Sequence, residues 1–187
     1  MLPLETPVPE FSLPSTDGSL VSSADFAGTR ALLIVFVCNH CPYVIHVRHD
    51  LEKLYEDYSP LGVGMVAINS NDIDEYPEDS PANMRERAEE WGWRFPYLFD
   101  EDQSVAKALT AACTPDAFLF ANGLLAYRGQ LDSSRPNNGV PVSGADIRRA
   151  IEAVLAGDVP DPEQHPSLGC SIKWKPGNDP LYLTDDL

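Results

Sequence analysis

The sequence predicts an α/β domain in which helices cover both faces of a mixed central sheet. Two apolar runs, residues 32–37 and 62–68, lack a polar face, as expected of parallel strands that are buried on both sides. Residues 44–58 between them carry apolar side chains at spacings of three and four, which indicates a helix. An Asn-Gly turn at residues 122–123 lies between two further apolar runs and predicts an antiparallel hairpin. Strands joined through helices and followed by an antiparallel pair form a mixed sheet.

The first half of the chain begins with a predicted hairpin, in which residues 11–13 and 20–21 flank the turn Asp17-Gly18. The first buried strand follows and ends directly at Cys38. The helix after it is expected to bury one stripe of side chains, made up of Val44, Val47, Leu51, Leu54, Tyr55 and Tyr58.

The middle of the chain contains a helix start at Ser80-Pro81. Ser80 is a typical N-cap residue, and proline is favoured at the first helical position, so we expect a helix that runs to about Trp91. A short strand is predicted at residues 95–99, and a short helix is predicted at residues 105–112.

The last predicted elements are a hairpin and a helix. The hairpin pairs residues 116–120 with residues 124–128. Ser143 and Asp146 have the spacing of a capping box, and Gly157 suits the end of the helix that they open. The apolar positions of this helix are Ile147, Ala150, Ile151, Val154 and Leu155.

Length and composition fit a single globular domain. The chain has 187 residues, of which 43% are hydrophobic, so it can bury a core without disulfide bridges. We expect residues 1–157 to form the domain, including the N-terminal hairpin. Residues 158–187 are rich in proline and are predicted to form an extended C-terminal arm of the same domain.

The net charge and the lengths of the apolar runs argue against nucleic-acid and membrane partners. The 29 acidic and 13 basic residues give a net charge of −16, which repels nucleic-acid phosphates and anionic lipid. The first residues show no basic segment before an apolar one, and the apolar runs are too short to span a bilayer. We therefore expect a cytoplasmic protein, a monomer or homodimer, that binds neither nucleic acid nor membrane.

The four cysteines are Cys38, Cys41, Cys113 and Cys170. In a reducing compartment they are not expected to form a structural disulfide framework. A Cys-x-x-Cys motif such as that of Cys38 and Cys41 is then either redox-active or metal-binding. The choice between these two chemistries decides the function.

The position of Cys38 favours redox chemistry. A cysteine between a buried strand and a helix lies near the helix N-terminus, whose N–H groups stabilise a thiolate. Cysteines in such motifs have pKa values of roughly 3.5 to 7.5. Cys41 follows after about one helical turn, so it can form a disulfide with Cys38 and resolve a mixed disulfide. His40 can supply positive charge to the Cys38 thiolate and so raise the reduction potential, and Pro42 is tolerated in the first helical turn.

These motifs resemble the thioredoxin-like superfamily, in particular its redoxin branch, which is related to alkyl-hydroperoxide-reductase and thiol-specific-antioxidant proteins. The similarity covers nearly the whole chain and is carried by residues 9–13, 17–18, 38–41, 95–100, 105–108 and 114–120. Residues 38–44 and 169–178 also resemble a narrower subgroup, which has a Cys-Asn-His-Cys-Pro-Tyr-Val active site and a Gly-Cys-x-Ile-Lys-Trp-Lys-Pro-Gly-Asn tail.

The resemblance implies a thioredoxin-like fold in which Cys38 is the nucleophile and Cys41 the resolving thiol. It implies that Pro115 is a cis-proline beside them, and that the backbone at Thr114 pairs with an extended substrate. The expected function is thiol–disulfide exchange with protein or small thiol partners, with electrons from another thiol system, as part of redox homeostasis or antioxidant defence. No cofactor is expected.

A peroxiredoxin-like thiol peroxidase is an alternative within the same superfamily. Peroxidatic sites carry Pro-x-x-x-Thr/Ser-x-x-Cys, and this chain has Ala31 and Val35 at the proline and hydroxyl positions before Cys38. The missing proline and hydroxyl argue against peroxide reduction at peroxiredoxin-like rates.

A copper- or zinc-binding protein is the alternative of another class. Cys38, His40 and Cys41, together with His46 and His49, provide thiolate and imidazole ligands within twelve residues. His49 lies roughly 12 Å along the predicted helix, too far to share one ion with the first turn. We therefore expect no metal ligands at the site.

Two further thiols are auxiliary candidates. Cys113 lies two residues before Pro115, and a small buried cysteine is the ordinary interpretation there. Cys170 lies in the arm, and our hypothesis is that the arm packs near the active site, where Cys170 modulates the redox cycle. Packing by Ile172 and Trp174 is the structural alternative for the arm.

Overall fold

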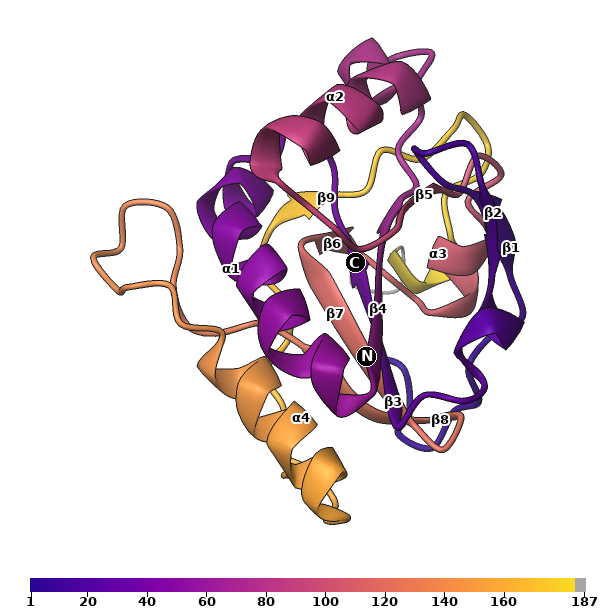
Figure 1. Ribbon diagram of the computed structural model, residues 1–187. Helices are drawn as coiled ribbons and strands as arrows, with labels where there is room; N and C mark the ends of the chain where they lie inside the picture. The colour runs from indigo at the N-terminus through magenta and orange to yellow at the C-terminus, as the bar shows by residue number, and fades with distance from the viewer. Residues whose placement is uncertain (184–187) are drawn as a thin grey trace.

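The computed structural model describes residues 1–183 and has a five-stranded mixed sheet at its centre (Figure 1). Its strand order is β5-β4-β3-β7-β8. The neighbours β3 and β4 are parallel, as are β4 and β5, whereas β7 runs antiparallel to both β3 and β8. The bounds are β3 Ala31–Phe36, β4 Val63–Asn69, β5 Tyr97–Phe99, β7 Asp116–Ala121 and β8 Leu124–Gly129. The predicted α/β fold with a mixed central sheet is confirmed.

Helices cover both faces of this sheet, and the alternating side chains of β3 divide the core between them. Leu33 and Val35 pack with side chains of α1, α2 and α4. Ile34 and Phe36 point to the other face, which is covered by α3, the N-terminal hairpin and part of the arm (Figure 1). The helices are α1 Pro42–Tyr58, α2 Pro81–Trp91, α3 Ser104–Ala108 and α4 Ala145–Ala156. Burial on both faces explains why the sequences of these central strands lack polar alternation.

The short elements lie around this core. The predicted N-terminal hairpin is present as β1 Ser12–Pro14 and β2 Leu20–Ser22, which pair antiparallel. A second two-stranded sheet joins β6 Cys113–Thr114 to β9 Cys170–Ser171. The 3-10 helices are η1 Ser23–Phe26, η2 Ser59–Leu61, η3 Pro77–Asp79 and η4 Leu181–Leu183. The sheet of β6 and β9 attaches the arm to the domain.

Two expected helix boundaries differ from the structure. The predicted capping box of Ser143 and Asp146 is wrong, because Gly144 is the N-cap of α4 in a left-handed conformation (φ +61°). The backbone N–H groups of Ser143 and Gly144 instead donate to Asp132 Oδ2, each at 2.6 Å. The α3 helix is shorter than residues 105–112, because the chain turns into a left-handed conformation at Thr110.

The C-terminal arm lies along the domain as far as the structure describes it, to residue 183. Ile172 is buried in the core on the α3 face of the sheet. Gln164 Oε1 accepts from Arg128, and the backbone N–H of Gln130 donates to His165 O at 3.0 Å. Hydrogen bonds at Gln164 and His165 and burial of Ile172 therefore hold the arm against the domain. No helix among the described residues is long and apolar enough to cross a membrane.

Candidate active site

The site lies where β3 ends and the chain turns into α1. Cys38 directly follows Val37, whose backbone N–H donates to Ile68 O of β4 at 2.9 Å. Cys41 is the N-cap residue of α1, and Pro42 occupies the first turn, where proline costs no helical hydrogen bond. Cys38 is 1% exposed and Cys41 is 0% exposed. The Cys-x-x-Cys motif is thus at the expected junction, but both sulfurs are buried.

A cis-peptide between Thr114 and Pro115 faces the two cysteines. Cys41 Sγ donates to Thr114 O at 3.1 Å, and Cys38 Sγ lies 3.5 Å from Thr114 Oγ1. The cis geometry that the resemblance implied is present. The structure therefore brings Cys38 and Cys41 next to Thr114 and Pro115, which lie more than 70 positions further along the chain.

The two thiols form a coupled pair. A hydrogen bond between them lowers the pKa of Cys41 to about 4, and Thr114, Cys170 and the N–H of Val44 in the first turn of α1 lower it further. The same hydrogen bond raises the pKa of Cys38, with burial and the negative charge of Asp79 acting in the same direction. The sequence placed the lowered pKa at Cys38. The structure places it at Cys41, because the neighbouring Cys38 thiol and the N–H of Val44 favour the Cys41 thiolate.

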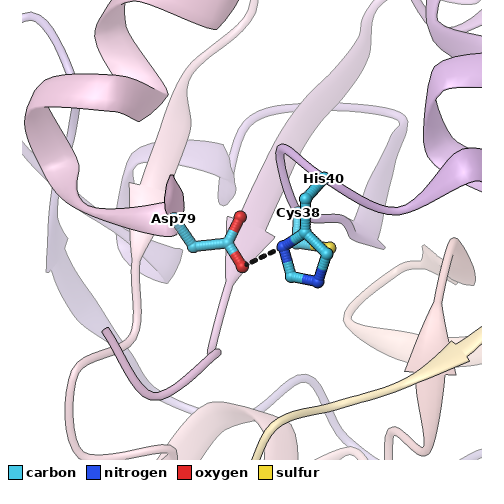
Figure 2. A group of neighbouring side chains, drawn as sticks. All are labelled: Cys38, His40 and Asp79. Atoms are coloured by element: carbon cyan, nitrogen blue, oxygen red, sulfur yellow. Dashed lines mark ion pairs between the residues drawn. The ribbon is translucent and has the colours of Figure 1, made fainter. Parts of the chain in front are cut away.

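His40 points toward a buried carboxylate that the sequence did not reveal (Figure 2). Its Nδ1 lies 2.9 Å from Asp79 Oδ2, and the imidazole stacks on Tyr76 with the ring centroids 5.7 Å apart. The Nδ1–Asp79 contact lacks the alignment of a hydrogen bond, so it is an electrostatic contact. Asp79 is 0% exposed. His40 is thereby held on the side of the motif that faces Asp79.

Backbone and amide donors hold Asp79 in place. Its Oδ1 accepts from the N–H of Asn39 at 2.7 Å, and its Oδ2 accepts from Asn71 Nδ2 at 2.7 Å. Asn39 is fixed in turn by Tyr97, whose hydroxyl donates to Asn39 Oδ1 at 3.1 Å. This network connects the loop of the motif with the ends of β4 and β5.

The residues that could bind a metal ion differ from those that the sequence suggested. Among the described residues, Cys38, His40 and Asp79 offer ligand atoms within 4.8 Å of one another. His46 and His49, which the sequence suggested, are not part of this group. The thiolate, imidazole and carboxylate of the three residues are suitable zinc ligands. Asp79 already accepts two hydrogen bonds from the protein, so the arrangement also satisfies the carboxylate without an ion.

Comparisons with known proteins identify the family of this chain. The sequence profile of the family described as Redoxin matches residues 3–145. The chain belongs to the Redoxin family.

Relatives of this Redoxin protein are similar over different lengths. An uncharacterized conserved protein from Geobacillus kaustophilus has a solved structure that is 55% identical, with a TM-score of 0.92 and 95% of each chain covered. A Mycobacterium tuberculosis protein named as a candidate peroxiredoxin is 28% identical over 100 residues. That match covers 54% of this chain and only 59% of the relative.

A more distant structure defines the fold. A thiol:disulfide interchange protein of the thioredoxin family from Chlorobium tepidum has a TM-score of 0.64 at 21% identity. The match covers 83% of this chain and 99% of that protein. The fold of this Redoxin protein is therefore thioredoxin-like, as the resemblance of its motifs implied.

The two auxiliary thiols lie on the paired strands β6 and β9. Cys113 is half-buried, and its Sγ lies 4.0 Å from Pro115 O. Burial and the negative charge of Asp116 raise the pKa of Cys113. Cys170 lies opposite Thr114 in the strand register and packs against the core cluster that contains Cys38 and Cys41. The arm thus packs at the active site, whereas a redox role of Cys170 stays a hypothesis.

Replacing His40 with leucine is expected to raise the pKa of Cys38 further. The imidazole lies beside Asp79, and the carboxylate charge opposes ionisation of Cys38. Without the imidazole, that charge acts on the sulfur unscreened. A pH titration of thiolate absorbance in the Cys41→Ser/Cys113→Ser/Cys170→Ser background measures the Cys38 thiol alone. The conservative variant His40→Gln separates loss of charge from loss of packing. An unchanged titration in His40→Leu would show that the imidazole does not tune Cys38.

Proposed function

We propose that this Redoxin protein is a thiol–disulfide oxidoreductase that uses Cys38 and Cys41 as a reversible dithiol. The observation that carries the proposal is the pair of buried thiols where β3 turns into α1, both of which contact Thr114: Cys41 Sγ donates to Thr114 O at 3.1 Å, and Cys38 Sγ lies 3.5 Å from Thr114 Oγ1. A pair so placed can close into a disulfide after a small movement. Its family membership and the thioredoxin-like fold support the same chemistry.

In the proposed reaction, Cys38 attacks one sulfur of a disulfide in a protein or small-molecule partner. Its proton passes to the neighbouring Cys41 thiolate, and the first thiolate of the partner leaves. Cys41 then loses the proton and attacks Cys38 Sγ, which releases the second thiol of the partner. The low pKa of Cys41 favours this step, because the thiolate is the reactive form. The enzyme is left with a Cys38–Cys41 disulfide.

The cycle needs reduction of that disulfide by a second thiol system. All four cysteines, which lie within the described residues, are free thiols. We propose a reducing compartment such as the cytoplasm, which supplies reduced thiols, as the place where this reduction occurs. Pro115 and the backbone of Thr114 border the dithiol and are proposed to position the partner disulfide.

The proposal predicts which cysteine traps partners. The Cys41→Ser variant should accumulate mixed disulfides through Cys38, because the resolving thiol is missing. Cys38→Ser should accumulate at least about tenfold fewer of them, since the attacking thiol is gone. Mass spectrometry of trapped complexes from cell extract, prepared without reductant, gives the attachment site, and Cys113→Ser serves as the matched control.

Two results would contradict the assignment. Equal trapping by Cys38→Ser and Cys41→Ser would exclude the proposed division of roles. Faster consumption of hydrogen peroxide than of partner disulfides would favour a thiol peroxidase. Peroxidatic sites have a Thr or Ser hydroxyl before the cysteine, where this chain has Val35. Here the Thr114 hydroxyl lies 3.5 Å from Cys38 Sγ instead, so the peroxidase activity is measured beside disulfide exchange.

A further inference from the structure

A third thiol is in contact with the buried pair. Strand β9 of the arm pairs antiparallel with β6, and the register sets Cys170 opposite Thr114 and Ser171 opposite Cys113. Because Cys41 Sγ donates to Thr114 O at 3.1 Å, the residue opposite Thr114 lies beside the motif. Cys170 packs against the core cluster that contains Cys38 and Cys41, and burial together with the neighbouring Cys41 raises the pKa of Cys170 to about 11. Of the three thiols, Cys41 is the one that interacts with both of the others.

The position of Cys170 is fixed by residues on both sides of it. A Cβ atom on Gly169 would lie 2.0 Å from Thr114 O, so the arm approaches this backbone more closely than any other residue type allows. After Cys170, Ile172 is buried and its N–H donates to Ala112 O at 3.1 Å. The N–H of Lys173 donates to Asn71 Oδ1 at 2.9 Å. These contacts hold β9 against the site rather than leaving Cys170 on a loose tail.

The three thiols differ in accessibility. Cys38 and Cys41 are 1% and 0% exposed, whereas Cys170 is only half-buried. A protein reductant that approaches the folded molecule therefore reaches Cys170 before it reaches either cysteine of the motif. Thiol–disulfide exchange requires direct attack on a sulfur, so access decides where an outside thiol reacts.

We propose that Cys170 is a third catalytic thiol, which takes over the disulfide of the buried pair and presents it to the reducing partner. The inference rests on the proposed function of Cys38 and Cys41. In the first step the Cys170 thiolate attacks Cys41 Sγ of the Cys38–Cys41 disulfide. The Cys41–Cys170 bond forms, the Cys38–Cys41 bond breaks, and Cys38 leaves as a thiolate that takes up a proton. No electrons enter or leave the protein in this step.

An external dithiol completes the cycle. Its thiolate attacks Cys170 Sγ, the Cys41–Cys170 bond breaks, and Cys41 leaves as a thiolate. The second thiol of the reductant then attacks the mixed disulfide and releases Cys170, so that two electrons pass from the dithiol to the protein. A thiol of lower pKa is the better leaving group, and the pKa of Cys41 is lowered to about 4. Cys41 is therefore well suited to be the sulfur that is released.

Disulfide mapping in a variant without Cys38 tests the pairing directly. Cys38→Ser protein is oxidised with one equivalent of diamide, alkylated and digested, and its disulfides are identified by mass spectrometry. We expect Cys41–Cys170 to be the dominant intramolecular disulfide. The Cys38→Ser/Cys113→Ser variant should still form it, and Cys38→Ser/Cys170→Ser should not. A dominant Cys41–Cys113 disulfide, or none, would overturn the proposal.

Reduction kinetics of the full chain test the role in turnover. With the Cys38–Cys41 disulfide formed, the Cys170→Ser variant should be reduced by a protein dithiol at least about tenfold more slowly than the wild-type protein. Reduction by dithiothreitol, which is small enough to reach a transiently opened site, should change by less than about twofold. Cys113→Ser is the matched control. Equal reduction of the wild-type protein and Cys170→Ser by the protein dithiol would refute the relay.

The two proposals fail in different ways. If the wild-type protein forms no Cys38–Cys41 disulfide while Cys38→Ser forms Cys41–Cys170, the proposed function is wrong, and the relay that starts from that disulfide is wrong with it. If Cys38–Cys41 forms and turns over normally in Cys170→Ser, the proposed function stands and the relay is wrong.

Discussion

Replacing Gly169 with alanine is expected to open the buried dithiol. The added Cβ would lie 2.0 Å from Thr114 O and 2.6 Å from Thr114 C, distances that no arrangement of the docked arm can accept. The carbonyl cannot retreat easily, because Cys41 Sγ donates to it at 3.1 Å. Strand β9 must therefore move away from β6. Cys170 would then lose its place beside Cys41.

The rate of thiol alkylation measures this opening. Forcing a methyl group into a filled space costs typically about 1–3 kcal/mol, and the local opening equilibrium then shifts by roughly tenfold to a hundredfold. We expect iodoacetamide to modify Cys41 faster in Gly169→Ala by that factor, as resolved by mass spectrometry of each cysteine. The fold should be retained, so far-ultraviolet circular dichroism should not change.

Gly28→Ala is the matched control for Gly169→Ala. A Cβ on Gly28 would meet no atom within 4 Å, and its backbone is in an ordinary conformation. This variant should leave the alkylation rates at their wild-type values. If Gly169→Ala also leaves them unchanged, the arm does not close the site, and the accessibility argument for Cys170 loses its basis.

The features that the sequence predicted correctly depend on local patterns. The buried strand that ends before Cys38, the helix that follows it and the Asn-Gly hairpin each have a periodicity or a turn signal within a few residues. The junction of strand and helix in turn locates the two thiols. One continuous segment thus carries enough information to place the motif in the fold.

The features that it missed depend on contacts between distant segments. Asp79 lies 40 residues from Asn39, and neither a spacing nor a motif links the two. Strands β6 and β9 have two residues each, too few to show alternation, and are paired through Thr114 and Cys170. The lowered pKa at Cys41 comes first from the adjacent Cys38 and is increased by Thr114 and Cys170, which lie elsewhere in the chain.

Asp116 is expected to make the protein less stable as the pH rises from about 4 to 7. This residue begins β7 directly after Pro115 and is 8% exposed. Burial raises its pKa to about 7 from the ordinary value of 3.8, although the backbone N–H of Ala112, which donates to Asp116 Oδ2 at 3.4 Å, acts in the opposite direction. The folded state therefore keeps a proton that the unfolded state has already lost.

The sign of the effect follows from this difference. The stability contribution of protonated Asp116 is fully present below about pH 4, where the carboxyl group is protonated in both states. It is lost as the pH rises to about 7, where the folded state loses its proton too. A pKa difference of this size corresponds to a loss of about 4 kcal/mol in the free energy of unfolding.

Urea unfolding at several pH values, compared between the wild-type protein and Asp116→Asn, isolates this contribution. The advantage of Asp116→Asn over the wild-type protein should grow from pH 4 to pH 7 and stay constant above that. Asp17→Asn is the control of opposite sign, because hydrogen bonds with Ser19 lower the pKa of Asp17 and its carboxylate stabilises the fold only at higher pH. A difference between wild type and Asp116→Asn that is constant from pH 4 to 8 would show that Asp116 has an ordinary pKa.

The same variant provides an independent chemical measurement at the active site. The Asp116 carboxylate is one of the charges that raise the pKa of Cys113, so Asp116→Asn should lower that pKa. The pH profile of Cys113 alkylation should therefore shift to lower pH in the variant, while folding remains intact. Because Cys113 pairs with Ser171 in β9, such a shift would show that the charge of Asp116 acts on the strand that holds the arm. Ionisation of one buried carboxyl near neutral pH would then influence both the stability of the fold and the thiol chemistry beside it.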